Sequence, residues 1–499
     1  MATVLSMDDL GLPSVFRVGE FAAWAVSAAH TQAAAFFATR NGLPAAPQVR
    51  VGVREAAIAF RSERYLRVDG EAAFEWAPLS GDYEAADGWV RLHCNFEHHA
   101  EIACRVLGVP QERAAVEAAV RRRGRFELED AIADAGGVAA AMRTRAEWVA
   151  HPQSAAVGGR PVVAMGALAG GGVFGGQAGR SGGGGRAGAG VGAESGAEAV
   201  GDSAAGSAAR LADESFGGSA GEPAPGWGAG SVGRLVGERA AGLAAGSATR
   251  PLSGIRVLDL TRIIAGPNAG RVLAGYGADV TMVRSPLLPT IRGLDLDLNV
   301  GKALRFLDLR SDAGREAFLD LVREADIVLQ SYRPGALAGL GLGPADLAAV
   351  KPNLVHVSIS AYGPDGPWGG RRGFDSLVQM AVGIAEEGMR AAGSERPVPL
   401  PAQVLDHGAG WLAAAGAIEA LRRGGGLAVE VSLAGVGHAL DAFGRLDPAV
   451  GLAVADPTLS DVDDLLLRGP SAAGTLTRVR FPGSVAGATL GWAGPPPHA

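Results

Sequence analysis

The sequence has only two cysteines and no cluster of metal-binding residues. Cys94 and Cys104 show no zinc-ligand spacing, so a disulfide framework or structural metal is not expected. The adjacent pair His98–His99 points in two directions from a helix, and we interpret it as a polar helix face rather than a metal site. Low cysteine content favours a reducing compartment, and we expect a cytoplasmic protein.

The chain also lacks an excess of positive charge and a long apolar run. Lys+Arg number 45 and Asp+Glu 52, and the net charge of −7 argues against general binding to nucleic acid or an anionic membrane. The longest uncharged run, Phe21 to Thr39, carries histidine and glutamine in its middle and predicts a buried helix rather than a membrane span. The N-terminus has two adjacent aspartates and shows neither the positively charged region nor the apolar region of a secretory signal.

Glycine is abundant, with 76 residues in 499, and with alanine it dominates residues 154–250. This stretch has no apolar periodicity and cannot bury enough side chain to offset the entropy of ordering, so we predict a flexible, disordered linker. The linker divides the chain into the following predicted parts: an N-terminal helical segment (1–50), a small α+β domain (51–153), a Rossmann-like domain (251–440) and a C-terminal tail (441–499).

Short β-branched runs alternate with helical segments after the linker. Apolar strands at crossover spacing predict an α/β fold with a parallel, doubly wound sheet, beside a second, smaller α+β domain. Glu20 and the alanine-rich helix after it parallel Asp406 and its own helix, which indicates an internal repeat or a chance match of alanines. The predicted strands are Ile255–Leu260, Ala278–Val283, Leu304–Leu309, Ala325–Gln330, Leu354–Ser360 and Ala428–Ser432.

Arginines follow the carboxyl ends of the first five predicted strands, the edge at which a parallel sheet binds ligands. Several guanidinium groups on one edge suit a ligand with several phosphates, although each arginine alone also fits a solvated loop. The first turn lacks a G-x-G-x-x-G motif, and the second strand ends in arginine instead of a carboxylate. A phosphorylated nucleotide is therefore favoured over NAD. The arginines are Arg262, Arg284, Arg310, Arg333, Arg371 and Arg372.

Two carboxylates at the starts of predicted helices, Asp375 and Asp406, are the candidate catalytic groups. Asp406 precedes Gly408 and Gly410, which we expect to leave space for a substrate. A carboxylate in such a confined site acts as a nucleophile or a base. Both residues also fit helix N-caps, and Asp406 can hold the two roles together.

A series of ordered motifs after the linker resembles family III CoA-transferases, which include formyl-CoA and carnitine CoA-transferases and α-methylacyl-CoA racemases. Segments around Ala86–Val90 and Arg143–Trp148 resemble the small domain of this family, which here precedes the Rossmann-like part. We therefore expect the two segments beside the linker to reassemble into one complete unit. The motifs are Pro251–Arg262, Ala265–Pro267, Gly277–Val280, Leu307–Leu309, Ala325–Val328, Tyr332–Gly335, Ser360–Gly363 and Gly366–Pro367.

The resemblance implies a nucleophilic aspartate at Asp406, an interlocked homodimer, and coenzyme A or acyl-CoA as a substrate, with no tightly bound cofactor or metal. The family often has an acidic residue where this chain has Arg284, so no contact is carried over to that position. The coenzyme A contacts carried over by the resemblance are Arg262, Ile264, Ala265, Leu307, Tyr332, Arg333 and Arg372.

The predicted function is transfer of coenzyme A from an acyl-CoA to a carboxylic acid through a covalent aspartyl intermediate. Racemases of this family have a histidine where this chain has Phe374, and phenylalanine cannot move a proton, which favours transfer. Two alternatives stay open. One is a racemase or epimerase that uses Asp406 with another base, and the other is a catalytically silent CoA-binding protein.

Overall fold

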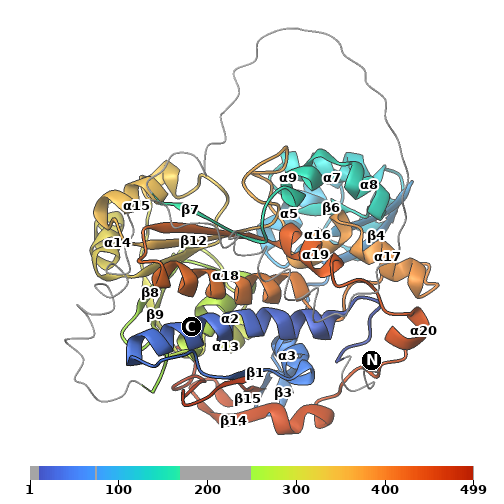
Figure 1. Ribbon diagram of the computed structural model, residues 1–499. Helices are drawn as coiled ribbons and strands as arrows, with labels where there is room; N and C mark the ends of the chain where they lie inside the picture. The colour runs from blue at the N-terminus through green and yellow to red at the C-terminus, as the bar shows by residue number, and fades with distance from the viewer. Residues whose placement is uncertain (1–10, 74–75, 169–248, 498–499) are drawn as a thin grey trace, which may run out of the picture.

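The computed structural model describes residues 11–73, 76–168 and 249–497, and it centres on a seven-stranded sheet (Figure 1). The strand order is β10-β9-β8-β11-β12-β13-β7. The first six strands are parallel in the order of a doubly wound sheet, which confirms the predicted α/β fold. The strands are β7 (Val163–Ala167), β8 (Arg256–Asp259), β9 (Asp279–Arg284), β10 (Lys302–Phe306), β11 (Ile327–Gln330), β12 (Val355–Ser360) and β13 (Leu427–Ser432).

Helices cover both faces of this sheet. On one face α18 (Val404–Arg422) packs against β12 and β13, and α2 (Val18–Asn41) packs against α18 (Figure 1). The buried helix predicted over Phe21 to Thr39 is confirmed, because both sides of α2 carry buried apolar residues. The same face holds α12 (Ala265–Gly275), and the opposite face holds α14 (Asp312–Glu324) and α15 (Pro344–Val350).

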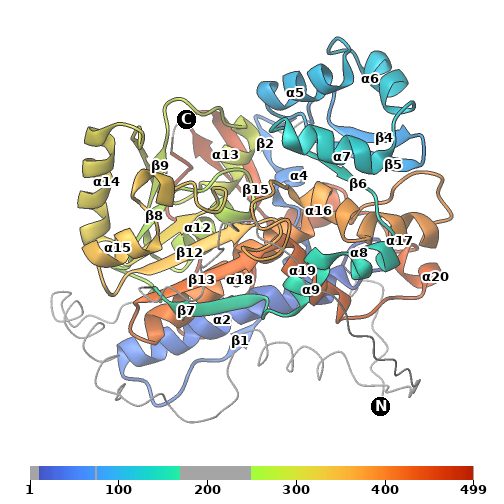
Figure 2. The same ribbon diagram turned by 90° about the horizontal axis from the view of Figure 1, so that it is seen from above.

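A smaller α+β unit stands beside the sheet and forms a separate lobe (Figure 2). Its three antiparallel strands and three helices enclose a core of their own, which includes both free cysteines. A second apolar cluster joins the unit to α16 (Asp375–Ala381) and α17 (Ile384–Ala391). The unit consists of β4 (Gly81–Ala85), β5 (Gly88–Leu92), β6 (Ala139–Ala141), α5 (Glu97–Leu107), α6 (Arg113–Val120) and α7 (Arg125–Asp134).

The boundaries predicted for the small domain and the C-terminal tail need correction. α3 (Val53–Ala59) buries its apolar side in the main core with α2, so the residues just after position 51 belong to that core. The tail is folded, because β15 pairs with both β14 and β2 in a four-stranded sheet. The elements of this region are β1 (Val49–Arg50), α4 (Ser62–Tyr65), β2 (Arg67–Val68), β3 (Glu71–Ala72), α20 (Pro448–Gly451), η2 (Ser460–Leu465), β14 (Leu466–Ser471), β15 (Gly474–Val479) and β16 (Ser484–Val485).

The predicted linker also begins too early, because residues 163–167 form β7 at the edge of the main sheet. Residues 169–248 of the predicted linker lie outside the described residues. The segments on either side of it pair through β7 with β13 and through β2 with β15, which confirms that they reassemble. The remaining elements are α8 (Arg145–Ala150), α9 (Pro152–Gly158), α13 (Arg292–Leu298), η1 (Ala338–Leu340) and α19 (Leu433–Asp441).

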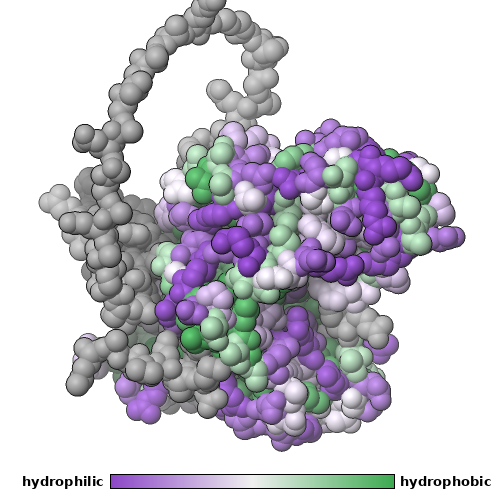
Figure 3. Space-filling view, turned by 90° about the vertical axis from the view of Figure 1, so that its right-hand side faces the viewer, coloured by the Kyte–Doolittle hydropathy of each residue, from purple (hydrophilic) through white to green (hydrophobic). Residues whose placement is uncertain are grey.

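Figure 3 shows one side of the molecule, with the small unit in its upper part. Hydrophilic residues cover most of that part, and apolar residues are scattered between them. The small unit thus buries its apolar side against α16 and turns polar side chains outward. Within the described ranges, no helix combines the length and apolarity that a membrane crossing needs.

Candidate active site

A cavity of about 390 Å³ lies at the carboxyl ends of β8, β11 and β12, where the small unit meets the sheet. The order of the parallel strands reverses between β8 and β11, and doubly wound sheets bind ligands at such a point. The cavity is lined by turns after the three strands, by the first turn of α18 and by the start of α5. Its polar and aromatic lining includes Phe96, His98, His99, Arg262, Ser331, Tyr332, Arg333, Ser360, Arg371, Arg372, Phe374 and Asp406.

The structure brings together the predicted nucleophile and all but one of the coenzyme A contacts that the resemblance implies. Leu307 follows β10, two strands away from β8, and packs against the apolar cluster under α14 instead of lining the cavity. The sequence correctly places Leu307 just after a strand. That strand, however, lies too far from the point where the strand order reverses for Leu307 to reach the cavity. The residues that do line the cavity are Arg262, Ile264, Ala265, Tyr332, Arg333, Arg372 and Asp406.

Four of the six arginines predicted at the sheet edge line the cavity: Arg262, Arg333, Arg371 and Arg372. Arg262 lies over the ring of Phe96 at 5.2 Å, and Arg372 donates a hydrogen bond to the carbonyl of Gly136 at 2.7 Å, so both connect the sheet to the small unit. Arg333 is exposed at the rim of the cavity. Because these side chains converge on one opening, they can bind several phosphate oxygens.

Two of the predicted arginines are engaged elsewhere. Arg284 is bound to Asp295, with one nitrogen–oxygen distance of 2.8 Å, and Arg310 pairs with Asp308 at 3.2 Å. Neither lines the cavity, because the guanidinium of Arg284 turns toward Asp295 on α13 and that of Arg310 turns toward Asp308 in its own loop.

Asp406 is the third residue of α18, and its exposed fraction is 6%. The N-cap of this helix is Gln403, so the prediction that Asp406 caps the helix is wrong. Its backbone N–H instead donates to Oδ2 of Asp375 at 2.9 Å. The side chain of Asp406 lines the cavity described above, here called the main cavity. It also lines an adjoining one of about 20 Å³, here called the small cavity, so it is free to meet a ligand.

The expectation that Gly408 and Gly410 leave space for a substrate is wrong. A Cβ at Gly408 would lie 2.8 Å from Phe21 on α2, and one at Gly410 would lie 2.6 Å from Asn268 on α12. Both glycines lie inside α18, where the absence of a side chain lets the helix pack closely against its two neighbours. They place the helix, and through it Asp406.

The environment of Asp406 opposes its ionisation. Burial raises the pKa of Asp406 well above its usual value, and the neighbouring carboxylates of Asp375 and Glu63 raise it further. Burial likewise raises the pKa of Asp375 to about 6. A carboxylate that is poorly solvated and lacks a nearby cation is a strong nucleophile once it has lost its proton.

The small unit contributes residues that sequence reasoning did not assign to the site. His99 is buried and, together with Phe96 and exposed His98, lines the cavity, so the interpretation of the histidine pair as only a polar helix face is wrong. Burial, together with His98, Arg372 and Arg262, lowers the pKa of His99 to about 4. The adjacent histidines were the signal in the sequence. Their place in the cavity depends on the contact between the small unit and the main sheet, which no local pattern shows.

His93, at the end of β5, stacks on Phe374 with the ring centroids 3.9 Å apart. It lines the small cavity together with Asp406 and is 4% exposed. Burial, and to a lesser extent His99 and Arg91, lowers the pKa of His93 to about 3, so its imidazole is neutral. A neutral imidazole therefore lies next to the cavity of the buried acid. In the described part of the chain, no three metal-binding side chains gather.

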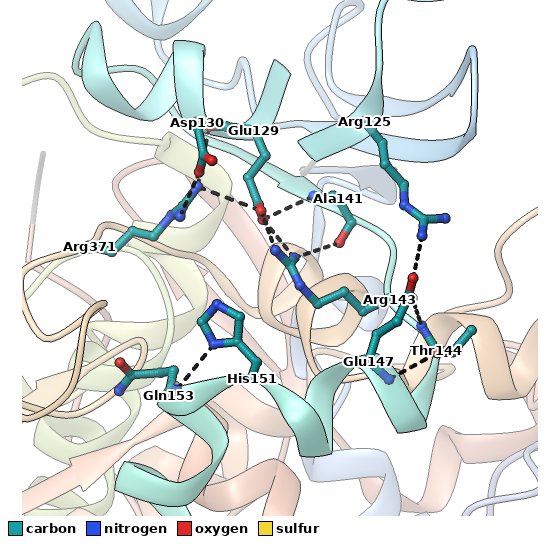
Figure 4. A network of polar contacts seen from close by, with 10 residues as sticks. All are labelled: Arg125, Glu129, Asp130, Ala141, Arg143, Thr144, Glu147, His151, Gln153 and Arg371. Carbon is teal, nitrogen blue, oxygen red and sulfur yellow. Dashed lines mark hydrogen bonds and ion pairs between the residues drawn. The ribbon is translucent and has the colours of Figure 1, made fainter. Parts of the chain in front are cut away.

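A polar network connects the small unit to the loop that carries Arg372 (Figure 4). Arg143 binds the buried carboxylate of Glu129 at 2.5 and 2.9 Å, while Arg371 donates to the carbonyl of Glu129 at 3.2 Å. Both guanidinium groups lie over the ring of Trp368, at 4.8 and 4.6 Å. The network fixes the loop from which Arg372 and Phe374 reach the cavity.

Ile263 has a positive φ of 77°, which is a strained backbone conformation for a β-branched residue. It lies in the turn after β8 and lines both the main and the small cavity. The sequence pattern around this turn gave no sign of the strain, because it shows only small and apolar residues after Arg262.

Comparisons with known proteins show which family and which relatives the chain is similar to. The sequence profile of CoA-transferase family III matches residues 20–170 and 252–445. A probable fatty acyl-CoA transferase of Mycobacterium tuberculosis is 36% identical over 185 residues, which cover 34% of this chain and 46% of that protein. A crystal structure of the same mycobacterial protein is 35% identical, covers 39% of this chain and 57% of that chain, and has a TM-score of 0.35.

Two further relatives are similar over comparable stretches. A formyl-CoA:oxalate CoA-transferase of Streptomyces avermitilis is 33% identical and covers 35% of this chain and 44% of that protein. A succinate–glutarate CoA-transferase of Agrobacterium fabrum is 31% identical and covers 42% of this chain and 59% of that protein. The chain thus spans about half the length of the curated relatives it matches.

Proposed function

Because the chain belongs to CoA-transferase family III, we propose that it transfers coenzyme A from an acyl-CoA thioester to a carboxylic acid, with Asp406 as the covalent carrier. The observation that supports this most is the placement around one cavity of several arginines and a buried carboxylate that forms no ion pair with the described residues. The relatives named as CoA-transferases support a thioester donor and an acid acceptor. Coenzyme A is then a substrate, and no tightly bound cofactor is part of the proposal.

The arginines hold the nucleotide end of the substrate while the thioester reaches Asp406. Arg262, Arg333 and Arg372 bind phosphate oxygens, and this remote binding energy positions the reacting atoms. Ile264, Ala265 and Tyr332 provide the apolar and backbone surface between the arginines and Asp406. Leu307 stays a prediction for a contact beyond the cavity, and its place under α14 gives it no support.

The transfer proceeds by successive nucleophilic attacks at carbonyl carbons. The ionised Asp406 attacks the thioester carbonyl, the carbon–sulfur bond breaks, and a mixed anhydride and a CoA thiolate form. The thiolate attacks the carbonyl of Asp406 and releases the donor acid, which leaves an aspartyl-CoA thioester. The acceptor carboxylate then attacks this thioester, and the thiolate returns to the acceptor's carbonyl and regenerates Asp406. No water enters, so the thioester free energy is kept.

Trapping the aspartyl thioester tests this proposal. Incubation with acyl-CoA and hydroxylamine is expected to convert Asp406 to a hydroxamate that peptide mass spectrometry locates. Asp406→Asn is expected to lose the adduct and to lower transfer by at least about a thousandfold, because the amide is a poor nucleophile. Full transfer by this variant would refute the role of Asp406. Tight CoA binding without adduct or turnover across a panel of acids would instead favour the silent CoA-binding protein.

A second candidate function, racemisation of acyl-CoA, is favoured by the position of His93. Such a reaction needs two groups, one to remove and one to return the α-proton, and the neutral imidazole of His93 and the carboxyl group of Asp406 line the same small cavity. Exchange of the α-hydrogen for deuterium in D₂O, without an acceptor acid, distinguishes the two functions. Exchange that is lost in His93→Gln would support the racemase, and its absence would leave transfer alone.

We also propose a cytoplasmic location and an interlocked homodimer. Sedimentation of the purified chain tests the second statement directly. A mass of one chain at all concentrations would refute it.

A further inference from the structure

Asp375 is a second buried carboxylate in direct contact with the nucleophile's helix. Asp375 is 1% exposed, and its Oδ2 accepts the N–H of Asp406 at 2.9 Å. The helix α18 has no side-chain cap of its own at Gln403, so this carboxylate from α16 satisfies an N–H at its start. The prediction that Asp375 is the N-cap of its own helix is wrong, because the N-cap of α16 is Phe374. Asp375 instead caps α18.

A neighbouring glutamine keeps the side chain of Asp375 in this position. Gln379, on the next turn of α16, donates through Nε2 to Oδ1 of Asp375. Its Oε1 accepts the N–H of Leu400 at 2.7 Å. One oxygen of Asp375 therefore faces Gln379 and the other faces Asp406. The arrangement connects α16 to the chain on both sides of the start of α18.

No cation neutralises the two aspartates within the ranges that the structure describes, since no ion pair is formed by Asp375 or Asp406 there. Glu63 contacts Nε2 of His407 at 3.1 Å. Asp375 is thus the carboxylate whose charge acts on the first turn of α18 through a direct hydrogen bond. The titratable and charged groups around the pair are Glu63 on α4, His407 on α18, His93 after β5, and Arg262 and Arg372 across the main cavity.

We propose that Asp375 is a positioning residue for Asp406: it holds the first turn of α18 so that Asp406 faces the cavity, and its negative charge opposes the ionisation of Asp406. This inference rests on the proposed role of Asp406 as the nucleophile. The pKa of Asp406 agrees with the geometry, because after burial the charge of Asp375 does most to raise it. Asp375 thereby sets both where the nucleophile points and at what pH it reacts.

A double substitution separates charge from geometry. In Asp375→Asn with Gln379→Glu, the asparagine oxygen still accepts the N–H of Asp406, and the asparagine amide donates to the new glutamate. That glutamate still accepts the N–H of Leu400 through its other oxygen, so these three hydrogen bonds are kept while the negative charge moves away from Asp406. The single variant Asp375→Asn leaves two amide NH₂ groups facing each other and serves as the comparison in which geometry is also disturbed.

Two readouts are measured on the full chain. The titration of Asp406 is followed by NMR of ¹³C-labelled aspartate carboxyl groups, with the signal assigned by its loss in Asp406→Asn. The rate of adduct formation is measured against pH. In the double variant, both midpoints are expected to fall by about one pH unit or more, because a like charge has been removed. Asp346→Asn, which removes a carboxylate that binds the start of α15, is the matched control and is expected to leave both midpoints in place.

Unchanged midpoints in the double variant would overturn the inference, as would a fall in rate at every pH with the same midpoint. The NMR titration does not depend on turnover, so the two proposals can fail separately. A shifted titration in a protein that forms no adduct would uphold the coupling of Asp375 to Asp406 and refute the transfer function.

Discussion

At the scale of single residues, the candidate site holds two buried acids, Asp375 and Asp406, that form no ion pair with any described residue. Asp406 and Asp375 both have raised pKa values, chiefly because burial removes water from their charged forms. Such groups lower stability at neutral pH, since the unfolded chain ionises them freely. Folding thus maintains an unfavourable arrangement at the position where the proposed chemistry needs a reactive carboxylate.

The pH dependence of unfolding follows from the sign of these shifts. A carboxyl group whose pKa is raised by folding contributes stability that is present below its unfolded pKa, near 3.8, and is lost as pH rises through the folded pKa, about 6 for Asp375. Asp406→Asn removes one such group and the repulsion between the pair. At pH 8 we expect the variant to be more stable than the wild type by about 1–2 kcal/mol, with the gap closing toward pH 4.

Urea unfolding of both proteins at pH 4, 6 and 8 measures this difference. Asp346→Asn again provides the control, because it removes a carboxylate that lines neither of the two cavities. A constant difference between Asp406→Asn and the wild type across the three pH values would contradict the prediction.

At the scale of elements, the strands that carry the site could be predicted because they are short apolar runs of β-branched residues. β8, β11 and β12 lie within the predicted ranges. β7 was missed because Val163–Ala167 contains two alanines and a glycine and adjoins a glycine-rich stretch, so nothing local distinguishes an edge strand from a linker. The start of α18 was misplaced because Asp is a common cap, while the actual cap, Gln403, uses no side-chain hydrogen bond.

The close packing of α18 against α12 leads to a second prediction. A Cβ at Gly410 would lie 2.6 Å from Asn268 and 2.7 Å from the carbonyl of Ala265, so the two helices must separate to admit alanine. We expect Gly410→Ala to lower the free energy of unfolding by about 1–3 kcal/mol. Gly370→Ala is the matched control, because no atom lies within 4 Å of a Cβ there. Equal stability of the two variants, measured by thermal unfolding, would contradict this account.

At the scale of the whole molecule, the candidate site depends on two segments that are distant in the sequence. The first contributes α2, the small unit and β7, and the second contributes the parallel sheet and α18. Residues such as Phe96 and His99 therefore could not be assigned from sequence, since their role arises when the two lobes meet. The pairing of β2 with β15 was equally hidden, because two-residue strands carry no local pattern.

This interdependence predicts that the two segments assemble even when no peptide bond joins them. Residues 1–168 and 249–499, produced as separate polypeptides in one cell, are expected to co-purify in equal amounts, because β7 completes the sheet at β13 and α2 packs along α18. Val26→Asp in the shorter polypeptide places a charge in the fully buried side of α2 and is expected to abolish co-purification. Val149→Asp, at a position 60% exposed on α8, is the matched control and is expected to preserve it. Separate elution of the two unsubstituted polypeptides from a sizing column would contradict this prediction. It would show that the segments need the covalent connection, so that the single folded unit results from tethering rather than from their shared core.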